Sequence, residues 1–254
     1  METSGGTSVS IRGLTKRFNS QVRHRNRWGL GGWLKDPPRT IFENLHFEIP
    51  AGQKVILTGP NGSGKTTFLK LLAGLLPYET GQISIVETPL TNLPDTFYPQ
   101  PNWVPSVKHQ GTPPSKLRHR IGLVLCFEML YLNLSGRENL EFAARAHQIP
   151  NPTIAVKNAA KHWGLTDHLP AAVTTYSYGL KARLNLARAT LHHPSLLLLD
   201  EPTIALDEVG NLLLLDYLKS SPATAIIATH QPEIFKELCP RIVALNPSRP
   251  GAVI

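Results

Sequence analysis

The stretch from Val55 to Thr67, Val-Ile-Leu-Thr-Gly-Pro-Asn-Gly-Ser-Gly-Lys-Thr-Thr, constrains the fold of this chain more than any other. An apolar run typical of a buried strand leads into a glycine-rich loop, and Lys65 opens a predicted helix. In this strand–loop–helix setting, backbone N–H groups and the positive end of the helix dipole surround phosphate oxygens. We expect Lys65 to reach the β- and γ-phosphates of a nucleoside triphosphate and the Thr66 hydroxyl to bind Mg²⁺. The residues expected to contact nucleotide here are Gly59, Pro60, Asn61, Gly62, Ser63, Gly64, Lys65, Thr66 and Thr67.

The composition, 254 residues with 41% hydrophobic, is typical of a soluble globular protein. The longest aliphatic runs, Leu196–Leu199 and Leu212–Leu215, are far shorter than the roughly 20 residues that cross a bilayer. The first ten residues are small and polar, unlike a signal peptide. Two cysteines, Cys126 and Cys239, suit a reducing compartment and predict neither a disulfide framework nor a zinc site. We therefore expect a protein of the cytosol or of the cytosolic face of a membrane.

The net charge of +8 is concentrated near the N-terminus. Between Arg12 and Arg39 the chain has eight Lys and Arg residues and one acid, Asp36. Such a segment, residues 12–39, suits an anionic membrane surface or nucleic acid, or it is a solvated loop. Trp28 and Trp33 favour an interface, because exposed tryptophan side chains are otherwise unfavourable.

Alternating strand and helix patterns predict an α/β fold with a mostly parallel sheet. Ser8–Leu14 is interpreted as an edge strand, and the alternation of residues 45–49 indicates a half-buried strand. Ser135 and Glu138 form a capping box, which predicts the start of a helix. Further helices are expected at Thr67–Leu76, Pro152–Trp163 and Ser177–His192, and further strands at Gln82–Val86, Ile121–Leu125, Leu196–Leu199 and Ala225–Thr229.

Two segments are interpreted as inserted loops. Residues 19–40 are rich in Arg, Gly and Pro, and residues 88–119 contain seven of the 22 prolines without sustained periodicity. Residues 135–192 have no strand pattern, which predicts a helical subdomain at about 127–185. The whole chain, residues 1–254, is expected to form a single domain.

A second stretch supplies acidic groups. The apolar run Leu196–Leu199 leads into Asp200 and Glu201, at the C-terminal end of a predicted parallel strand, where ligands bind in open α/β sheets. We expect Asp200 to hold Mg²⁺ through a water molecule and Glu201 to act as general base on the attacking water. His230 ends the next predicted strand and is expected to contact the γ-phosphate and help orient that water.

The stretch Tyr176–Arg183, Tyr-Ser-Tyr-Gly-Leu-Lys-Ala-Arg, precedes this acidic strand. In this order with the phosphate loop, it resembles the signature motif Leu-Ser-Gly-Gly-Gln of ATP-binding cassette (ABC) transporter ATPases, in a variant associated with exporters. The resemblance covers roughly residues 7–245. It implies a P-loop NTPase core with a mostly parallel sheet, an N-terminal antiparallel β-subdomain and an α-helical subdomain.

The resemblance also assigns roles to further residues. Phe18 would stack on adenine, and Ser177 and Gly179 would bind the γ-phosphate held by the opposite subunit. The loop Ala205–Asp207, with Asp207 at its end, would link the two sites across a dimer. These roles agree with the physical chemistry, because a serine hydroxyl, a glycine N–H and a helix N-terminus together form an anion site.

The sequence departs from the family at Cys126, where a glutamine that senses Mg²⁺ and the attacking water is usual. Cysteine is a poor ligand for a hard cation. Water or Glu128 then takes the place of the glutamine, or hydrolysis is slower than usual, or Cys126 is a buried hydrophobic residue.

The resemblance implies an ATP-binding and ATP-hydrolysing subunit of an ABC exporter, with ATP and Mg²⁺ as cofactors, at the cytoplasmic face of the membrane. Its partners would be a separate membrane permease, docking near residues 127–145 or also on the insertion at 88–119, and a second ATPase subunit in a homo- or heterodimer. The signature variant resembles exporters of polysaccharides, drugs or lipids, and Thr229–Pro232 resembles the haem-exporter type.

Two other functions compete with transport. A soluble ABC ATPase acting on DNA or ribosomes would suit the basic segment, but residues 68–176 lack coiled-coil heptads and the chain has one cassette. A GTPase would require the guanine-reading Asn-Lys-x-Asp, which the sequence lacks. Transport is therefore favoured, and nucleic acid is not an expected partner.

Overall fold

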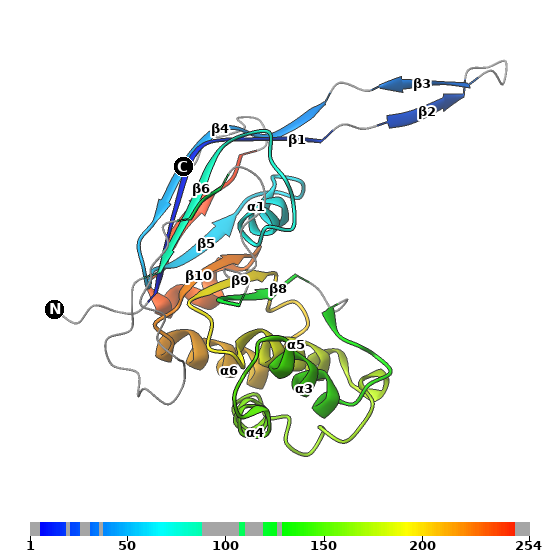
Figure 1. Cartoon of the computed structure of the whole chain (residues 1–254), viewed down its shortest axis with the longest axis vertical. Helices are drawn as coiled ribbons and strands as arrows, with labels where there is room; N and C mark the ends of the chain where they lie inside the picture. Colours follow the sequence, from blue (N-terminus) through cyan, green and yellow to red (C-terminus); the bar gives the residue numbers. More distant parts are fainter. Residues whose placement is uncertain are drawn as a thin grey trace.

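The computed structural model describes residues 6–18, 21–25, 31–35, 38–87, 107–109, 119–125 and 129–246. An antiparallel sheet, a parallel sheet and a group of helices follow one another as layers (Figure 1). The predicted combination of a mostly parallel core, an N-terminal antiparallel sheet and a helical part is confirmed. Within the described ranges, no helix is both long enough and apolar enough to cross a membrane.

The described helices, apart from Glu208–Ser220 and the two 3-10 helices, which the sequence did not predict, begin close to where the sequence predicts them. They are α1 (Lys65–Leu72), α3 (Gly136–Ala146), α4 (Pro152–His162), α5 (Tyr178–Thr190) and α6 (Glu208–Ser220), with the 3-10 helices η2 (Val173–Thr175) and η3 (Pro232–Leu238). The predicted capping box of α3 is present: Ser135 Oγ accepts the Glu138 N–H at 3.2 Å, and the Glu138 carboxylate accepts the Ser135 N–H at 2.7 Å.

The predicted helix Thr67–Leu76 is too long at its C-terminal end. Helix α1 stops at Leu72 because Gly74 adopts a left-handed φ of 66°. The Leu75 N–H then donates to the Lys70 carbonyl oxygen at 2.8 Å, which closes the helix end.

The parallel sheet has the strand order β11-β5-β10-β9-β8. Its strands are β5 (Lys54–Thr58), β8 (Ile121–Val124), β9 (Leu196–Asp200), β10 (Thr224–Ala228) and β11 (Arg241–Ala244). Both faces of β9 are covered, which explains its continuous leucine run. Leu196 and Leu198 join the core cluster around α1 and the antiparallel sheet, whereas Leu197 and Leu199 join the cluster of α3 to α6.

The antiparallel sheet has the order β4-β1-β6-β7, formed by β1 (Thr7–Phe18), β4 (Arg39–Ile49), β6 (Thr80–Glu87) and β7 (Val107–His109). The prediction that Ser8–Leu14 is an edge strand is wrong, because Val9 pairs with Ile49 on one side and with Ile85 on the other. The sheet packs on α1 through Phe68, whose ring lies 5.9 Å from that of Phe42 in an edge-on contact. Helix α1 is thereby fixed between the two sheets.

The two predicted insertions contain regular structure. In the first, residues 19–40, β2 (Gln21–Arg25) and β3 (Gly31–Lys35) pair as an antiparallel ribbon, so the loop prediction is wrong for these strands. In the second, residues 88–119, β7 pairs with β6, while the rest of the segment except His119 lies outside the described residues. The sequence pattern did not predict the β2–β3 ribbon or β7, because backbone pairing between antiparallel strands does not depend on a hydrophobic pattern.

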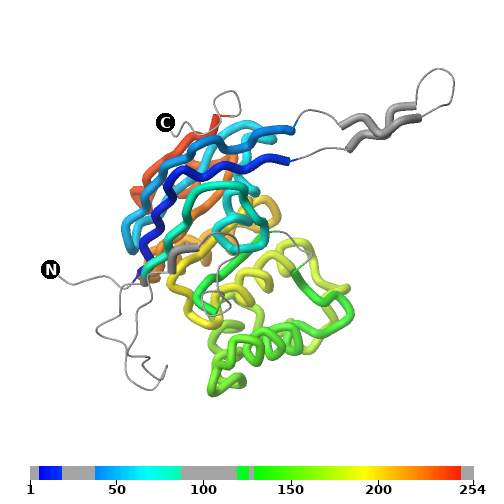
Figure 2. Tube along the Cα trace, turned by 45° about the horizontal axis from the view of Figure 1, so that its top comes forward, coloured from blue at the N-terminus to red at the C-terminus, as the bar shows by residue number. Residues whose placement is uncertain are grey.

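The predicted helical subdomain at about 127–185 corresponds to α3, α4 and most of α5. These helices lie on the opposite side of the parallel sheet from the antiparallel strands (Figure 2). Trp163, at the end of α4, is 1% exposed, and its Nε1 donates to Thr190 Oγ1 of α5 at 3.1 Å. This contact joins α4 to α5, the helix that begins at the predicted signature motif.

Candidate nucleotide-binding site

The phosphate loop connects the end of β5 to the start of α1, as predicted. Gly64 at the N-cap of α1 has a φ of 100°. A Cβ at this position would lie 2.7 Å from Cγ2 of Ile41 and 3.0 Å from Cζ of Phe42. Because both the dihedral angle and the packing exclude a side chain, only glycine fits without strain.

Replacing Gly64 by alanine is therefore expected to weaken ATP binding by about 10-fold or more and to lower the free energy of unfolding by about 1–3 kcal/mol. Isothermal titration with ATP and urea unfolding measure the two effects. Gly179→Ala is the matched control for stability, because a Cβ there meets nothing closer than 3.5 Å. Wild-type ATP affinity in Gly64→Ala would contradict this role of Gly64.

Lys65, the first residue of α1, folds back over the phosphate loop. Its Nζ donates to the Gly59 carbonyl oxygen at 2.7 Å and lies 3.2 Å from Nε2 of His230. Burial lowers the pKa of Lys65, while the charges of Glu201 and Asp200 oppose this effect. The ammonium is thus held by a backbone carbonyl that a phosphate oxygen can replace.

Thr66 and Asp200 meet, as predicted, although they are far apart in sequence. Thr66 Oγ1 donates to Asp200 Oδ2 at 2.7 Å, which joins the start of α1 to the end of β9. Burial raises the pKa of Asp200, the hydrogen bond from Thr66 opposes this shift, and the charge of Glu201 adds to it. A hydroxyl and a carboxylate oxygen therefore converge at one point.

Because the folded-state pKa of Asp200 is raised, ionisation of this carboxyl opposes folding. The protonated carboxyl contributes fully to the stability of the folded state below the unfolded pKa of about 4. This contribution is lost as the pH rises through the folded pKa. We expect Asp200→Asn to raise the melting temperature of the nucleotide-free protein at pH 7 and to lose this advantage near pH 4. Thermal unfolding across this range, with exposed Asp216→Asn as control, measures the effect. The same gain at both pH values would contradict it.

Glu201 has an unusual backbone conformation, with a left-handed φ of 47°. Its N–H donates to the Ala228 carbonyl oxygen at 2.8 Å, which holds this conformation against β10. Its Oε2 accepts the His230 N–H at 3.3 Å, and its Oε1 lies 3.4 Å from His230 Nε2. The strained backbone thereby presents the carboxylate beside His230, as expected for a positioned base.

These groups line one cavity of about 570 Å³. Phe18 at the end of β1 also lines it and is 39% exposed, as suits a ring that stacks on a base. The predicted residues that line the cavity are Phe18, Asn61, Gly62, Ser63, Gly64, Lys65, Thr66, Thr67, Asp200, Glu201 and His230. The carbonyl oxygens of Gly59 and Pro60 lie 2.7 and 3.5 Å from Lys65 Nζ.

Arg39 also lines the cavity, and the sequence did not predict it. It is the first residue of β4, opposite Phe18, and its Nη2 donates to the Gly62 carbonyl oxygen at 2.9 Å. A single arginine before a strand carries no distinctive signal, because its reach to the phosphate loop depends on the pairing of β1 with β4.

The signature residues lie elsewhere: of the described residues, Ser177, Gly179 and Asp207 do not line this cavity. Ser177 caps α5, where its Oγ accepts the Leu180 N–H at 3.2 Å. Asp207 caps α6 and pairs with Arg183 of α5 at 2.9 Å, which ties the signature helix to the loop Ala205–Asp207. Cys126 lies outside the described residues, so its role stays a prediction.

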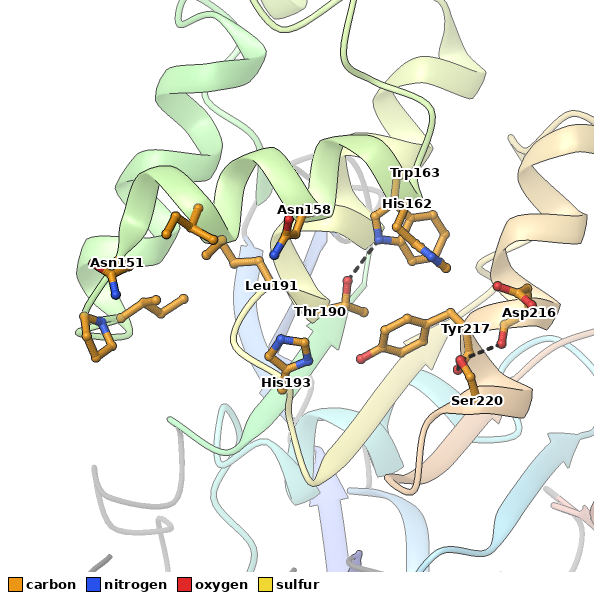
Figure 3. A pocket seen from close by; sticks show the side chains of 15 residues that line it. Asn151, Asn158, His162, Trp163, Thr190, Leu191, His193, Asp216, Tyr217 and Ser220 are labelled. Carbon is orange, nitrogen blue, oxygen red and sulfur yellow. Dashed lines mark hydrogen bonds between the residues drawn. The ribbon is translucent and has the colours of Figure 1, made fainter. Parts of the chain in front are cut away.

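A second cavity of about 420 Å³ lies between α4, the end of α5 and α6 (Figure 3). It is lined partly by Trp163, His193 and Tyr217, and the Tyr217 ring extends from α6 toward His193. None of the predicted site residues lines it. The predicted chemistry therefore belongs to the first cavity.

Comparison with known proteins shows which family of nucleotide-binding proteins this chain belongs to. Residues 42–204, more than half of the chain, match the family described as ABC transporter. The chain belongs to the ABC transporter family. The resemblance seen in Tyr176–Arg183 is thereby confirmed.

Several ABC proteins are similar to this chain over most of its length. It is 30% identical to the linearmycin resistance ATP-binding protein LnrL of Bacillus subtilis, over 80% of this chain and 61% of that protein. It is 32% identical to the Nod factor export ATP-binding protein I of Rhizobium meliloti, over 82% and 58% of the two chains. It is 39% identical to the cytochrome c biogenesis ATP-binding export protein CcmA of Xylella fastidiosa, over 68% and 71%. The chain thus spans about three fifths of the length of several relatives.

The fold has a solved counterpart among ABC proteins. The dimeric structure of the ATP-binding cassette MJ0796 in a post-hydrolysis state matches with a TM-score of 0.72 and 20% identity, over 97% of each chain. At this identity the match establishes the shared fold, in agreement with the ABC family assignment.

Proposed function

We propose that this chain hydrolyses ATP and powers export through a membrane permease on a separate chain. The observation that carries the proposal is the placement of the Glu201 carboxylate beside His230 in the cavity that holds Lys65. A carboxylate base, an anion-binding lysine and a glycine-rich loop in one cavity are the groups that ATP hydrolysis requires.

In this reaction Glu201 accepts a proton from a water molecule whose oxygen attacks the γ-phosphorus of ATP. The bond from that phosphorus to the β,γ-bridging oxygen breaks, which yields ADP and phosphate. Lys65 exchanges the Gly59 carbonyl for oxygens of the β- and γ-phosphates. His230 positions Glu201 through its backbone N–H. Its Nε2 lies 3.0 Å from Asn61 Oδ1 and 3.4 Å from Glu201 Oε1, and it would exchange one of these contacts for an oxygen of the γ-phosphate.

The residues present also fit Mg²⁺. Thr66 Oγ1 and Asp200 Oδ2 are oxygen donors 2.7 Å apart, and such donors suit a hard cation. Burial, with the charge of Glu201 adding to it, raises the pKa of Asp200, and a bound cation would favour the charged carboxylate there. Bound Mg²⁺ would neutralise phosphate charge at this point, while Thr66 and Asp200 hold it.

Two subunits are proposed to complete each other's sites. Ser177 and Gly179 lie outside the cavity of their own chain, at the exposed start of α5, so they are available to the nucleotide of another chain. Tyr178 is 75% exposed and Ile204 is 73% exposed, and Ile204 lines the cavity. A second subunit, identical or related, would cover these apolar side chains.

The permease is proposed to dock on the helical part. Tyr131, Leu132 and Phe142 are each about half exposed, and the rings of Tyr131 and Phe142 lie 5.0 Å apart. They form an apolar surface within the range 127–145 that the sequence indicated. Such a contact would place the ATPase at the cytoplasmic face of the membrane. Export is supported by two relatives, a Nod factor export protein and a cytochrome c biogenesis export protein.

Mixing two inactive variants tests the shared sites. Lys65→Ala and Ser177→Ala chains should each be nearly inactive alone, because each removes one half of every site. Mixed in equal amounts, they should regain about a quarter of the wild-type ATPase rate, since half of the pairs are mixed and hold one intact site. Mixing each variant with itself is the control. No recovery in the mixture would contradict pairing between copies of this chain.

A further inference from the structure

The cavity between α4, the end of α5 and α6, here called the α4–α6 cavity, lies apart from the nucleotide site (Figure 3). Its volume of about 420 Å³ is within the range of sites that bind small organic molecules. Among the described residues, the two cavities have no lining residue in common. A molecule bound in the α4–α6 cavity would therefore be selected by side chains that the proposed ATPase reaction does not use.

The inner wall of the α4–α6 cavity is buried and largely apolar. It is formed by Trp163, Thr190 and Leu191, which are 1%, 3% and 5% exposed. Trp163 Nε1 donates to Thr190 Oγ1 at 3.1 Å, and Thr190 Oγ1 donates to the Leu186 carbonyl oxygen at 2.8 Å. Because these hydrogen bonds satisfy the side-chain donors of the inner wall, a ligand meets mostly carbon atoms there. The inner wall therefore favours a ligand with an apolar body.

Aromatic side chains of α4 and α6 adjoin this wall. The ring centre of Tyr217 lies 5.8 Å from that of Trp163 and 5.7 Å from that of His162. The ring centres of His162 and Trp163 are 5.0 Å apart, and all three residues line the cavity. A flat aromatic ligand gains free energy by packing on such rings, and the faces of tryptophan and tyrosine also attract cations.

The outer rim of the α4–α6 cavity is polar, and its exposed residues include Asn151, Asn158 and Asp216. Among the described residues that line the cavity, Asp216 is the only acid, and none is a lysine or an arginine. The nucleotide cavity differs in this respect, since Lys65 and Arg39 line it. An anionic ligand would thus find no lysine or arginine in the α4–α6 cavity, whereas a cationic ligand would find the carboxylate of Asp216.

We propose that the α4–α6 cavity binds a small aromatic amine in its ammonium form. The ring lies against Trp163 and Leu191 beside Tyr217, and the ammonium group lies at the rim near Asp216. Burial of the ring provides most of the binding free energy. The carboxylate and the aromatic faces then favour the ammonium form over a neutral or an anionic analogue. This binding goes beyond the proposed ATPase function, and it is measurable without nucleotide.

Isothermal titration of the full chain, without nucleotide and near neutral pH, tests the proposal with three compounds that share one ring system. The cation is β-naphthylmethylamine, the neutral analogue is β-naphthylmethanol and the anion is β-naphthoate. The amine should bind with a dissociation constant on the order of 0.1 mM, which is reasonable for a ligand of about a dozen heavy atoms. The alcohol should bind about threefold more weakly than the amine, and the naphthoate about 10-fold more weakly.

Two substitutions in the cavity have matched controls outside it. Ala159→Phe, at a partly buried position of α4 that lines the cavity, places a ring in the space for the ligand and should weaken amine binding by about 30-fold or more. Thr153→Phe adds the same ring at an exposed position of α4 that does not line the cavity, and amine binding should stay within about twofold of the wild type. Asp216→Asn should weaken amine binding about threefold and leave binding of the alcohol unchanged. Its control, Asp167→Asn, is at an exposed position outside the cavity and should affect neither compound.

The outcomes distinguish this cavity from the nucleotide site and from non-specific binding. Amine binding that both cavity variants weaken and both controls retain supports the proposal. Saturating MgATP should leave amine binding unchanged, because the two cavities have no described lining residue in common. Any one of four results overturns the proposal: no amine binding at millimolar concentration, equal affinity for the naphthoate, displacement of the amine by MgATP, or the same loss of binding in a control variant. If the melting temperature shows that Ala159→Phe does not fold, Asp216→Asn decides, and wild-type amine affinity in that variant overturns the proposal.

Discussion

The Glu201→Gln protein should hydrolyse ATP about 10²–10⁴-fold more slowly than the wild type while binding ATP with similar affinity, because it lacks the base that accepts the water proton. Glutamine has nearly the same shape and can keep the contact with the His230 N–H. Phosphate release at saturating MgATP measures the turnover, and titration of a fluorescent ATP analogue measures the affinity. Glu233→Gln, at an exposed position of η3, is the matched control.

Retained turnover in Glu201→Gln would contradict the assignment of the base. Loss of the fold is not expected to obscure this test. The left-handed φ of 47° at Glu201 is about equally unfavourable for glutamate and for glutamine. Glu201 is held there by the Ala228 carbonyl oxygen irrespective of its side chain. The variant should therefore fold normally, with a melting temperature close to that of the wild type.

The second large effect is expected from Lys65→Ala, which should weaken ATP binding by about 100-fold or more. The Lys65 Nζ lies 2.7 Å from the Gly59 carbonyl oxygen of the glycine-rich loop, and truncating a buried charge partner typically removes at least this much affinity. Isothermal titration with ATP measures the change. AMP should bind with little difference between variant and wild type, since it lacks the β- and γ-phosphates.

Lys70→Ala provides the control for Lys65→Ala, because Lys70 belongs to the same helix but does not line the cavity. It should bind ATP within about threefold of the wild type, as expected for a partly exposed charge. ATP affinity in Lys65→Ala equal to that of the wild type would overturn the role of the phosphate loop.

The elements that surround the phosphates were predictable because their signals are local. The phosphate loop is contiguous, and its glycines, lysine and threonine lie between a strand and a helix that the hydrophobic pattern reveals. Asp200 and Glu201 follow the apolar run Leu196–Leu199, and a continuous apolar run is itself typical of a strand buried inside a parallel sheet. The order of these motifs, with Tyr176–Arg183 between them, was enough to indicate the family.

What the sequence did not reveal depends on neighbours far along the chain. The central position of β1 results from β6, and Val9 alone does not show that Ile85 pairs with it. Arg39 enters the nucleotide site because β4 pairs with β1 and brings its guanidinium to Gly62. The left-handed conformation of Glu201 is likewise imposed by β10 and has no signature in the residue itself.

The most direct test of the paired ATPase is the molar mass of Glu201→Gln, measured by light scattering with and without saturating MgATP. We expect 28.0 kDa without nucleotide and twice that mass with it, because the uncleaved nucleotide holds each phosphate loop against the signature residues of another chain. Adding Ser177→Ala to the same chain should return the mass to that of one copy. A mass of one copy for Glu201→Gln at saturating MgATP, with ATP shown to be bound, would contradict the account.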